Sequence, residues 1–201
     1  MKRIVFLFCC ALLLSAAPQG FTQTTTQTPV PLPLDHGGKI ESKYDGFERE
    51  TVVALKKMKV TCGAGKGFEG TFKQTCVSLS ASLHCPGKQL DYVRRARLQL
   101  VFEAKDWDSR HPLGARDLTA VADGETLRLG TMRLRDQRVD SGKFDETMNE
   151  VLEVSVPYKT FAKIANSSAV ELSVGKTAFA LREKNVAALR DLNNRVRLAG
   201  R

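Results

Sequence analysis

The chain has 201 residues, of which 42% are hydrophobic and 26% are charged, and these shares are ordinary for a globular protein. Its formal net charge of +9 favours acidic partners such as anionic envelope polymers, phospholipid headgroups or nucleic acid, without selecting among them. Only 7% of the residues are aromatic, and they are not interleaved with the basic runs, which argues against a surface that stacks single-stranded nucleic-acid bases. We therefore expect no specific nucleic-acid partner.

The first 20 residues have the composition of a secretory signal peptide. Lys2 and Arg3 form a basic start, and residues 4–14 form an apolar run of about eleven residues, shorter than the roughly 20 needed to span a bilayer. Residues 15–17 are small, as signal peptidase requires. No later apolar run is long enough to cross a membrane. We expect export to the periplasm or the medium, cleavage of the signal peptide and no transmembrane span in the mature chain.

The next segment, residues 21–43, is rich in Thr, Gln and Pro. Such a composition cannot bury enough apolar surface to offset the entropy lost on ordering, so the sequence predicts a flexible linker. Roughly 155 residues remain, which suits one domain with a sizeable core. We therefore expect a signal peptide at 1–20, a linker at 21–43 and a single β-rich domain at 44–201.

The first half of this domain has the alternating hydrophobicity of strands. Residues 51–55 and 58–60 are β-branched and apolar but out of phase across the two lysines between them, which predicts one strand with a bulge or bend. A glycine-rich loop follows at 62–70. Residues 75–85 alternate most cleanly, with apolar side chains on one face and mainly Ser and His on the other. Residues 97–103 repeat that pattern.

The middle of the domain predicts a hairpin. Residues 117–122 lead into Asp123-Gly124, a strong two-residue turn signal, and residues 125–129 return. Gly130 shifts the hydrophobic phase, which predicts a second bulge. Charged residues dominate 137–147, which we expect to form a loop.

The last part of the chain has the clearest periodicity. A strand at 151–156 precedes Pro157, which suits the first turn of a short helix ending near Asn166. Two strands follow around the turn Gly175-Lys176, and residues 183–198 form a helix with acids early and arginines late. The fold class we expect is mainly β (α+β): an antiparallel β-sandwich-like domain with a short helix and a C-terminal helix packed on a sheet face or edge.

Three cysteines follow the signal peptide, and export favours a disulfide between two of them. Cys76 and Cys85 lie on one predicted strand about 30 Å apart and face opposite ways, whereas a disulfide needs Cα atoms within about 7 Å. We predict a Cys62–Cys76 bond and a buried Cys85 thiol, with Cys62–Cys85 as the alternative. His84 adjoins Cys85, but neighbouring strand residues point to opposite faces, so we do not expect a catalytic cysteine.

Two stretches match the residue types of known binding sites but lack the surrounding structure or charge that those sites need. Residues 65–70 match a dinucleotide-binding fingerprint, but they lead into a strand where that motif requires a helix. Residues 106–111 hold two carboxylates and an imidazole, which are ligand types for calcium or zinc, but Arg110 among them repels a cation. We expect a polar loop anchored by Trp107, with no metal and no cofactor.

Basic residues recur at positions that we expect to face outward on the strands. If they align on one sheet face, they form a patch that binds anions. The candidate anion-binding residues are Arg94, Arg95, Arg97, Arg128, Arg133 and Arg135.

Several short motifs follow one another along the domain: a Tyr-Asp-x-Phe…Thr-x-Val opening, a Trp followed by Ala-Asp-Gly, a Phe with Ile-Ala-Asn, and a closing Leu-Arg-Asp. They occur here as Tyr44-Asp45-Gly46-Phe47, Thr51-Val52-Val53, Trp107, Ala122-Asp123-Gly124, Phe161, Ile164-Ala165-Asn166 and Leu189-Arg190-Asp191. With these motifs in this order, the chain resembles a group of uncharacterised exported bacterial proteins. The resemblance covers roughly residues 44–197 and implies a sandwich-like fold and export, but no catalytic residue.

These observations predict an exported, non-enzymatic binding or structural module of the cell envelope. They leave its partner open, with an anionic envelope component or an envelope protein as the candidate. Two alternatives stay open. An adaptor for an anionic envelope polymer predicts a contiguous basic face and binding that weakens steeply with salt. A hydrolase predicts a cleft that gathers the carboxylates and the histidine of residues 106–111.

Overall fold

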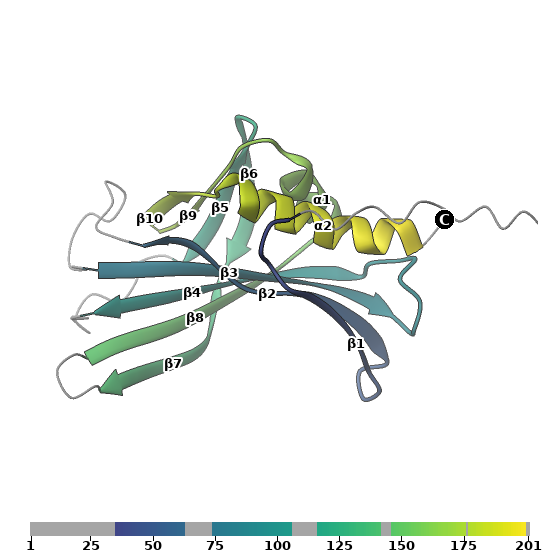
Figure 1. The fold of residues 1–201 in the computed structure, drawn as a ribbon, viewed down its shortest axis with the longest axis horizontal. Coiled ribbons are helices and arrows are strands. Elements are labelled where there is room, and N and C mark those ends of the chain that lie inside the picture. The colour runs from purple at the N-terminus through teal and green to yellow at the C-terminus, as the bar shows by residue number, and fades with distance from the viewer. Residues whose placement is uncertain (1–34, 63–73, 106–115, 142–145, 176, 200–201) are drawn as a thin grey trace, which may run out of the picture. The chain divides into compact units, whose positions relative to one another are not determined.

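The computed structural model describes residues 35–62, 74–105, 116–141, 146–175 and 177–199, which belong to the compact unit Pro33–Arg201. Within these ranges the chain forms ten strands and two helices. The strands form two antiparallel sheets (Figure 1), so the fold is mainly β, of the α+β, sandwich-like kind that the sequence predicts.

The larger sheet has six strands in the order β1-β2-β3-β4-β8-β7, and the smaller has four in the order β10-β9-β5-β6. The strands of the larger sheet are β1 (Ile40–Asp45), β2 (Glu50–Cys62), β3 (Gln74–Pro86), β4 (Arg95–Lys105), β7 (Arg133–Ser141) and β8 (Glu146–Val156). Those of the smaller sheet are β5 (Asp117–Ala122), β6 (Glu125–Thr131), β9 (Val170–Val174) and β10 (Thr177–Ala180). The helices are α1 (Tyr158–Asn166) and α2 (Glu183–Ala199).

The larger sheet has an apolar face and a polar face because its strands alternate. On β3 the alternate residues from Val77 to Cys85 are at most 4% exposed. The smaller sheet packs on this apolar face, where Phe102 of β4 meets Phe179 of β10 edge to face with ring centroids 6.4 Å apart. Helix α2 also contacts β2 and β3 there (Figure 1). The opposite, polar face of the larger sheet carries the candidate site.

Helix α2 packs through the apolar stripe that the sequence predicts. Val186, Leu189, Leu192 and Val196 are each at most 3% exposed, at helical spacing along one side. Polar contacts hold the helix near its start and along its length: the Asn185 Nδ2 donates to the Lys59 carbonyl oxygen at 3.2 Å, and the Tyr158 hydroxyl donates to Asn193 Oδ1 at 2.9 Å.

The predicted bulges and turn are present. The β2–β3 register shifts between Leu55 and Met58, so both of these side chains point into the core. Asp123 and Gly124 have φ angles of +48° and +85°, the left-handed conformations of a two-residue hairpin turn. Gly130 has a φ of +106° beside the β5–β6 register shift. After it the chain leaves the smaller sheet and enters the larger one, crossing at the buried Met132.

Two expectations about element boundaries were wrong. Strand β1 begins at Ile40, so the order extends into the segment 21–43 that composition assigned to a flexible linker. The charged stretch 137–147 is not a loop throughout, because β7 continues to Ser141 and β8 begins at Glu146. Both β1 and β7 are edge strands of the larger sheet, where polar and charged side chains are common and hide the apolar alternation.

Candidate functional site

Four of the six predicted anion-binding arginines line one hollow of about 470 Å³ on the polar face of the larger sheet. We call it the arginine hollow; its charged and polar lining residues include Arg95, Arg97, Arg133, Arg135, Thr131, Glu153 and Ser155. Strand order explains the grouping, since β8 lies between β4 and β7. In the register, Arg97 pairs with Ser155, and Arg133 pairs with Glu153.

The arginine hollow has an excess of positive charge. Arg95 donates two hydrogen bonds from Nη2 to Glu50, at 3.1 and 3.3 Å, and Arg135 lies 3.8 Å from Glu153. Arg97 and Arg133 make no side-chain hydrogen bond or ion pair with any residue of the described ranges. Their guanidinium groups are therefore available to an anion, which arginine binds with two parallel hydrogen bonds.

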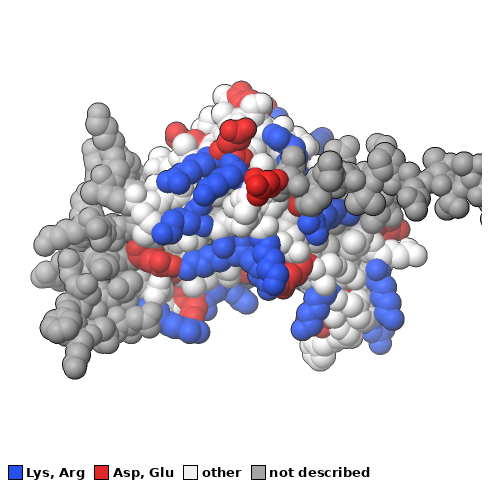
Figure 2. All heavy atoms as spheres, viewed as in Figure 1, with Lys and Arg blue, Asp and Glu red and all other residues white. Residues whose placement is uncertain are grey.

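The remaining two predicted residues lie elsewhere. Arg94 is exposed in the turn between β3 and β4, and its backbone N–H donates to the His84 carbonyl oxygen at 2.8 Å. Arg128 is exposed on β6. Neither lines the arginine hollow. On the face drawn in Figure 2, Lys and Arg side chains lie among Asp and Glu, so the positive charge there is not one unbroken surface.

A chain of three hydrogen-bonded side chains lies next to the arginine hollow. The His84 Nδ1 lies 2.6 Å from Glu50 Oε1, and the His84 Nε2 lies 3.0 Å from the Ser82 hydroxyl. Glu50 and His84 are each 4% exposed, whereas Ser82 is partly exposed. This arrangement of hydroxyl, imidazole and carboxylate is the one that activates a serine in many hydrolases.

Burial and neighbouring charges set the protonation states of His84 and Glu50. Burial lowers the pKa of His84, and the nearby guanidinium groups of Arg97 and Arg95 lower it further against the opposing effect of Glu50. Burial alone would raise the pKa of Glu50, but hydrogen bonds and charges from His84 and Arg95 outweigh it, so that pKa is lowered. At neutral pH the imidazole is therefore neutral, with Nδ1–H donating to the ionised Glu50 and Nε2 accepting from Ser82.

The hydrogen-bonded row of Ser82, His84 and Glu50 was not predicted from the sequence. Ser82 and His84 were assigned to the polar side of their strand, and a Ser-x-His pair on one strand face was the available signal. Glu50 is 34 residues from His84, and the contact exists because β2 pairs with β3 in a register that puts Val52 opposite His84. Such a register is a long-range property that no local pattern displays.

Ser82 opens onto a second hollow of about 390 Å³, which we call the serine hollow. Its polar lining residues are Lys56, Lys57, Ser80, Ser82, His84, Arg97, Gln99 and Glu153. The serine hollow and the arginine hollow share Arg97 and Glu153, so they adjoin on the same sheet face.

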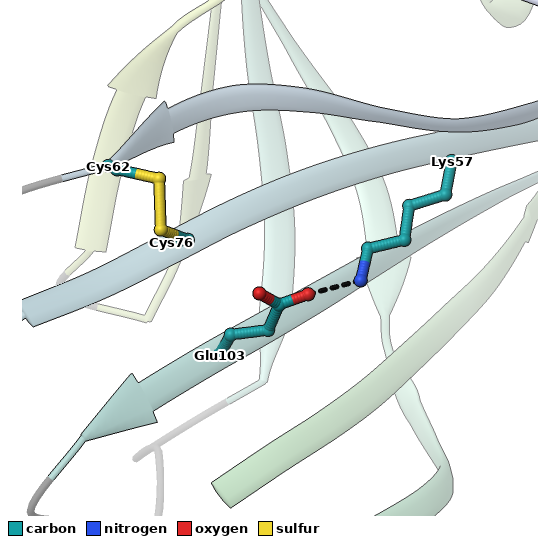
Figure 3. The surroundings of a disulfide bond; sticks show 4 residues. All are labelled: Lys57, Cys62, Cys76 and Glu103. Carbon is teal, nitrogen blue, oxygen red and sulfur yellow. Dashed lines mark hydrogen bonds and ion pairs between the residues drawn. A yellow bond between two sulfur atoms is a disulfide. The ribbon is translucent and has the colours of Figure 1, made fainter. Parts of the chain in front are cut away.

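The disulfide that the sequence predicts is present. Cys62 and Cys76 are directly opposite each other on β2 and β3, with Cα atoms 4.1 Å apart, near the ion pair between Lys57 and Glu103 (Figure 3). Cys85 is buried as predicted, and burial, with the charges of Asp91 and Glu50, raises its pKa to about 11. A thiol with that pKa is protonated at neutral pH and is a poor nucleophile.

Other predicted features lie outside the described residues. These are the glycine-rich stretch 65–70, the loop 106–111 with its carboxylates and histidine, and Trp107. The part of the chain that the structure describes has no cluster of three His, Cys, Asp or Glu side chains that could hold a metal ion. None of its helices is long and apolar enough to cross a membrane.

Comparisons of this chain with protein families, with curated proteins and with solved structures found no match. The resemblance to exported bacterial proteins therefore stays a prediction. The function has to be inferred from the geometry of the polar sheet face.

Proposed function

We propose that this chain is an exported binding module of the cell envelope that recognises an acidic polymer through the arginine hollow. The observation that carries the proposal is the grouping of four arginines around one hollow, two of them without a counter-ion among the described residues. Export is supported by the basic and apolar N-terminal segment and by the Cys62–Cys76 disulfide, which is typical of oxidising compartments.

Arg97 and Arg133 supply the recognition in this proposal. They approach the hollow from β4 and β7, on either side of β8, so an anionic group seated between them contacts two strands at once. Glu153 alone contributes negative charge to the lining, and it lies 3.8 Å from Arg135. An anion therefore meets an excess of positive charge held on a rigid sheet.

A polymer fits this face better than a small ion because the hollows adjoin. The serine hollow continues from Arg97, and a third hollow of about 630 Å³ continues from Lys57 along β4, β7 and β8. Lys57 and Arg138 line that third hollow, together with Glu103 and Asp136. An extended ligand that places a negative group at Arg97 and polar groups beside the ion-paired Lys57 and Arg138 follows this row, whereas a single anion occupies only the arginine hollow.

The test measures binding of the full chain to fluorescent dextran sulfate by anisotropy, with neutral dextran as the reference ligand. The variant Arg97→Gln/Arg133→Gln should weaken binding at least about tenfold, because hydrogen bonds to charged groups contribute about 1.5–3 kcal/mol each. Binding by the parent should also fall steeply as salt rises, because these charges face solvent.

The matched control is Arg94→Gln/Arg128→Gln, which removes the same two charges outside the hollow. It should bind within about twofold of the parent, since exposed charges at a distance are screened by salt. Equal weakening in both double variants would show that net charge, and not the arginine hollow, determines binding, and would overturn the proposal.

A further inference from the structure

The geometry points to Ser82 as the nucleophile of an ester-hydrolysing site, with His84 as its general base and Glu50 as the residue that orients His84. This inference departs from the expectation of a non-enzymatic module. It does not depend on polymer binding, because Ser82 and His84 line the serine hollow and not the arginine hollow, although Arg97 lines both. Its substrate class is an ester that carries a negative charge.

The three side chains contact one another in the order that a serine nucleophile needs. The Ser82 hydroxyl donates to His84 Nε2 at 3.0 Å, and His84 Nδ1–H donates to Glu50 Oε1 at 2.6 Å. Arg95 holds the same carboxylate through two further hydrogen bonds, so Glu50 is fixed in place. A general base must lie within hydrogen-bonding reach of the proton that it removes, and His84 does.

Ser80 provides an internal comparison. It lies on the same strand and the same face, and it lines the same hollow. Its hydroxyl donates to the Gln99 side-chain oxygen at 3.0 Å and makes no contact with an imidazole. Two serines with similar surroundings therefore differ in the one feature that activates a hydroxyl, the adjacent base.

A negative charge forms on the substrate carbonyl oxygen when Ser82 attacks, and it needs hydrogen-bond donors. Ser82 is in a central strand, paired with Ala54 on β2 and Arg97 on β4, so backbone N–H groups of the sheet ladder are committed there. A side chain must stabilise the oxyanion instead. Arg97 lies directly across from Ser82, lines the hollow and has no side-chain partner among the described residues. Its guanidinium supplies fixed donors at the place where charge develops.

The lining of the serine hollow also selects the substrate. Lys56, Lys57 and Arg97 contribute positive charge, against Glu153. Because Arg97 faces the carbonyl oxygen, a negative group elsewhere on the substrate is attracted by Lys56 and Lys57, whose side chains stay half-exposed in their ion pairs with Glu41 and Glu103. An anionic ester is therefore held with its carbonyl near Ser82.

The reaction balances without a metal or a redox partner. The Ser82 oxygen bonds to the ester carbonyl carbon while its proton moves to His84 Nε2, and the carbonyl electrons move to the oxygen facing Arg97. The tetrahedral intermediate collapses, the ester C–O bond breaks, and the leaving alcohol takes the proton from His84. Water then repeats these steps on the acyl-serine, releasing the acid and restoring the Ser82 hydroxyl.

The test incubates the full chain, with its disulfide oxidised, with a fluorophosphonate and locates the adduct by peptide mass spectrometry. We expect one phosphonyl group on Ser82, formed as fluoride leaves and His84 takes the hydroxyl proton. The Ser80→Ala variant should label at the parental rate, and Ser82→Ala should not label. The His84→Gln variant should label about 100-fold or more slowly, the usual effect of losing a general base. Labelling of Ser80 in preference to Ser82 would overturn the inference.

The pH dependence of labelling in the parent gives a readout that needs no variant. Glu50 of β2 and Arg95 and Arg97 of β4 face His84, with the ion-paired Lys56 and Lys57 also lining the hollow from β2 and Glu153 from β8. Burial and the arginines favour the neutral imidazole of His84. The labelling rate should therefore increase with pH as His84 loses its proton, and this increase should be complete at a pH below ~6.5. A rate that keeps rising in proportion to hydroxide up to pH 9 would contradict a role for His84.

Failure of this inference can be told apart from failure of the proposed function. Arg133 lines only the arginine hollow, so Arg133→Gln should weaken dextran sulfate binding and leave the labelling rate unchanged. Ser82→Ala should abolish labelling and leave dextran sulfate binding unchanged. Loss of both properties in either single variant would contradict the separation of the two sites.

Discussion

Glu50 is the residue on which the polar cluster depends. It is 4% exposed, and its carboxylate accepts from both His84 and Arg95. A buried charge is tolerated when partners replace the water that it loses, and removing one partner leaves that charge uncompensated. The cluster joins β2, β3 and β4 at one end of the larger sheet, so its ionisation is coupled to folding.

Acidification should therefore destabilise the protein in two steps. The pKa of His84 is lowered in the folded state, so the unfolded chain binds a proton more readily and stability falls as pH drops below ~6.5. The pKa of Glu50 is also lowered, and its contribution is lost below ~4.3. Urea unfolding between pH 7.5 and pH 5 should show a decreasing free energy of unfolding.

The variant His84→Gln removes the group that titrates in the upper part of this range. Its free energy of unfolding should change less than that of the parent between pH 7 and pH 5.5. Ser82→Ala keeps both titrating groups, so its pH dependence should match that of the parent. An equally steep decrease in His84→Gln and in the parent would assign the titration to another residue.

At the scale of elements, local patterns predicted much of the fold. The alternation along 75–85 and the stripe of α2 were confirmed, because each places apolar side chains at one strand or helix period. The Asp123-Gly124 turn was confirmed because these residue types tolerate positive φ. Strand β7 was missed because it is an edge strand with mostly exposed, charged side chains. The positions of Arg95, Arg97, Arg133 and Arg135 on the polar face were expected. Whether they group at one place stayed open in the sequence, because the grouping follows from the strand order β4-β8-β7.

The Cys62–Cys76 bond joins β2 to β3 at the last residue of β2. The two cysteines are 14 residues apart, and a loop of that length predicts a stabilisation of about 3 kcal/mol. The variant Cys62→Ala/Cys76→Ala should lose about that much in urea unfolding. Dithiothreitol should lower the melting temperature of the parent and not that of the variant. Insensitivity of the parent would show that the bond adds no stability.

At the scale of the folded unit, the two faces of the larger sheet have different roles. The smaller sheet and α2 contact the apolar face, and one continuous cluster of buried residues results. The polar face holds the three adjoining hollows and the Glu50 cluster. A rigid sheet supports both proposals, because strands hold side chains more firmly than loops do. The packing of one face therefore fixes the positions of the arginines on the other.

The most direct measurement is a titration of the ¹⁵N-labelled protein with a sulfated disaccharide, following the arginine Nε–Hε resonances by NMR. We expect the signals of Arg97 and Arg133 to shift together and saturate at one concentration, because both line the arginine hollow. The signals of Arg94 and Arg128 should stay in place. Similar shifts at all four arginines, or none at Arg97 and Arg133, would contradict an anion site in the arginine hollow.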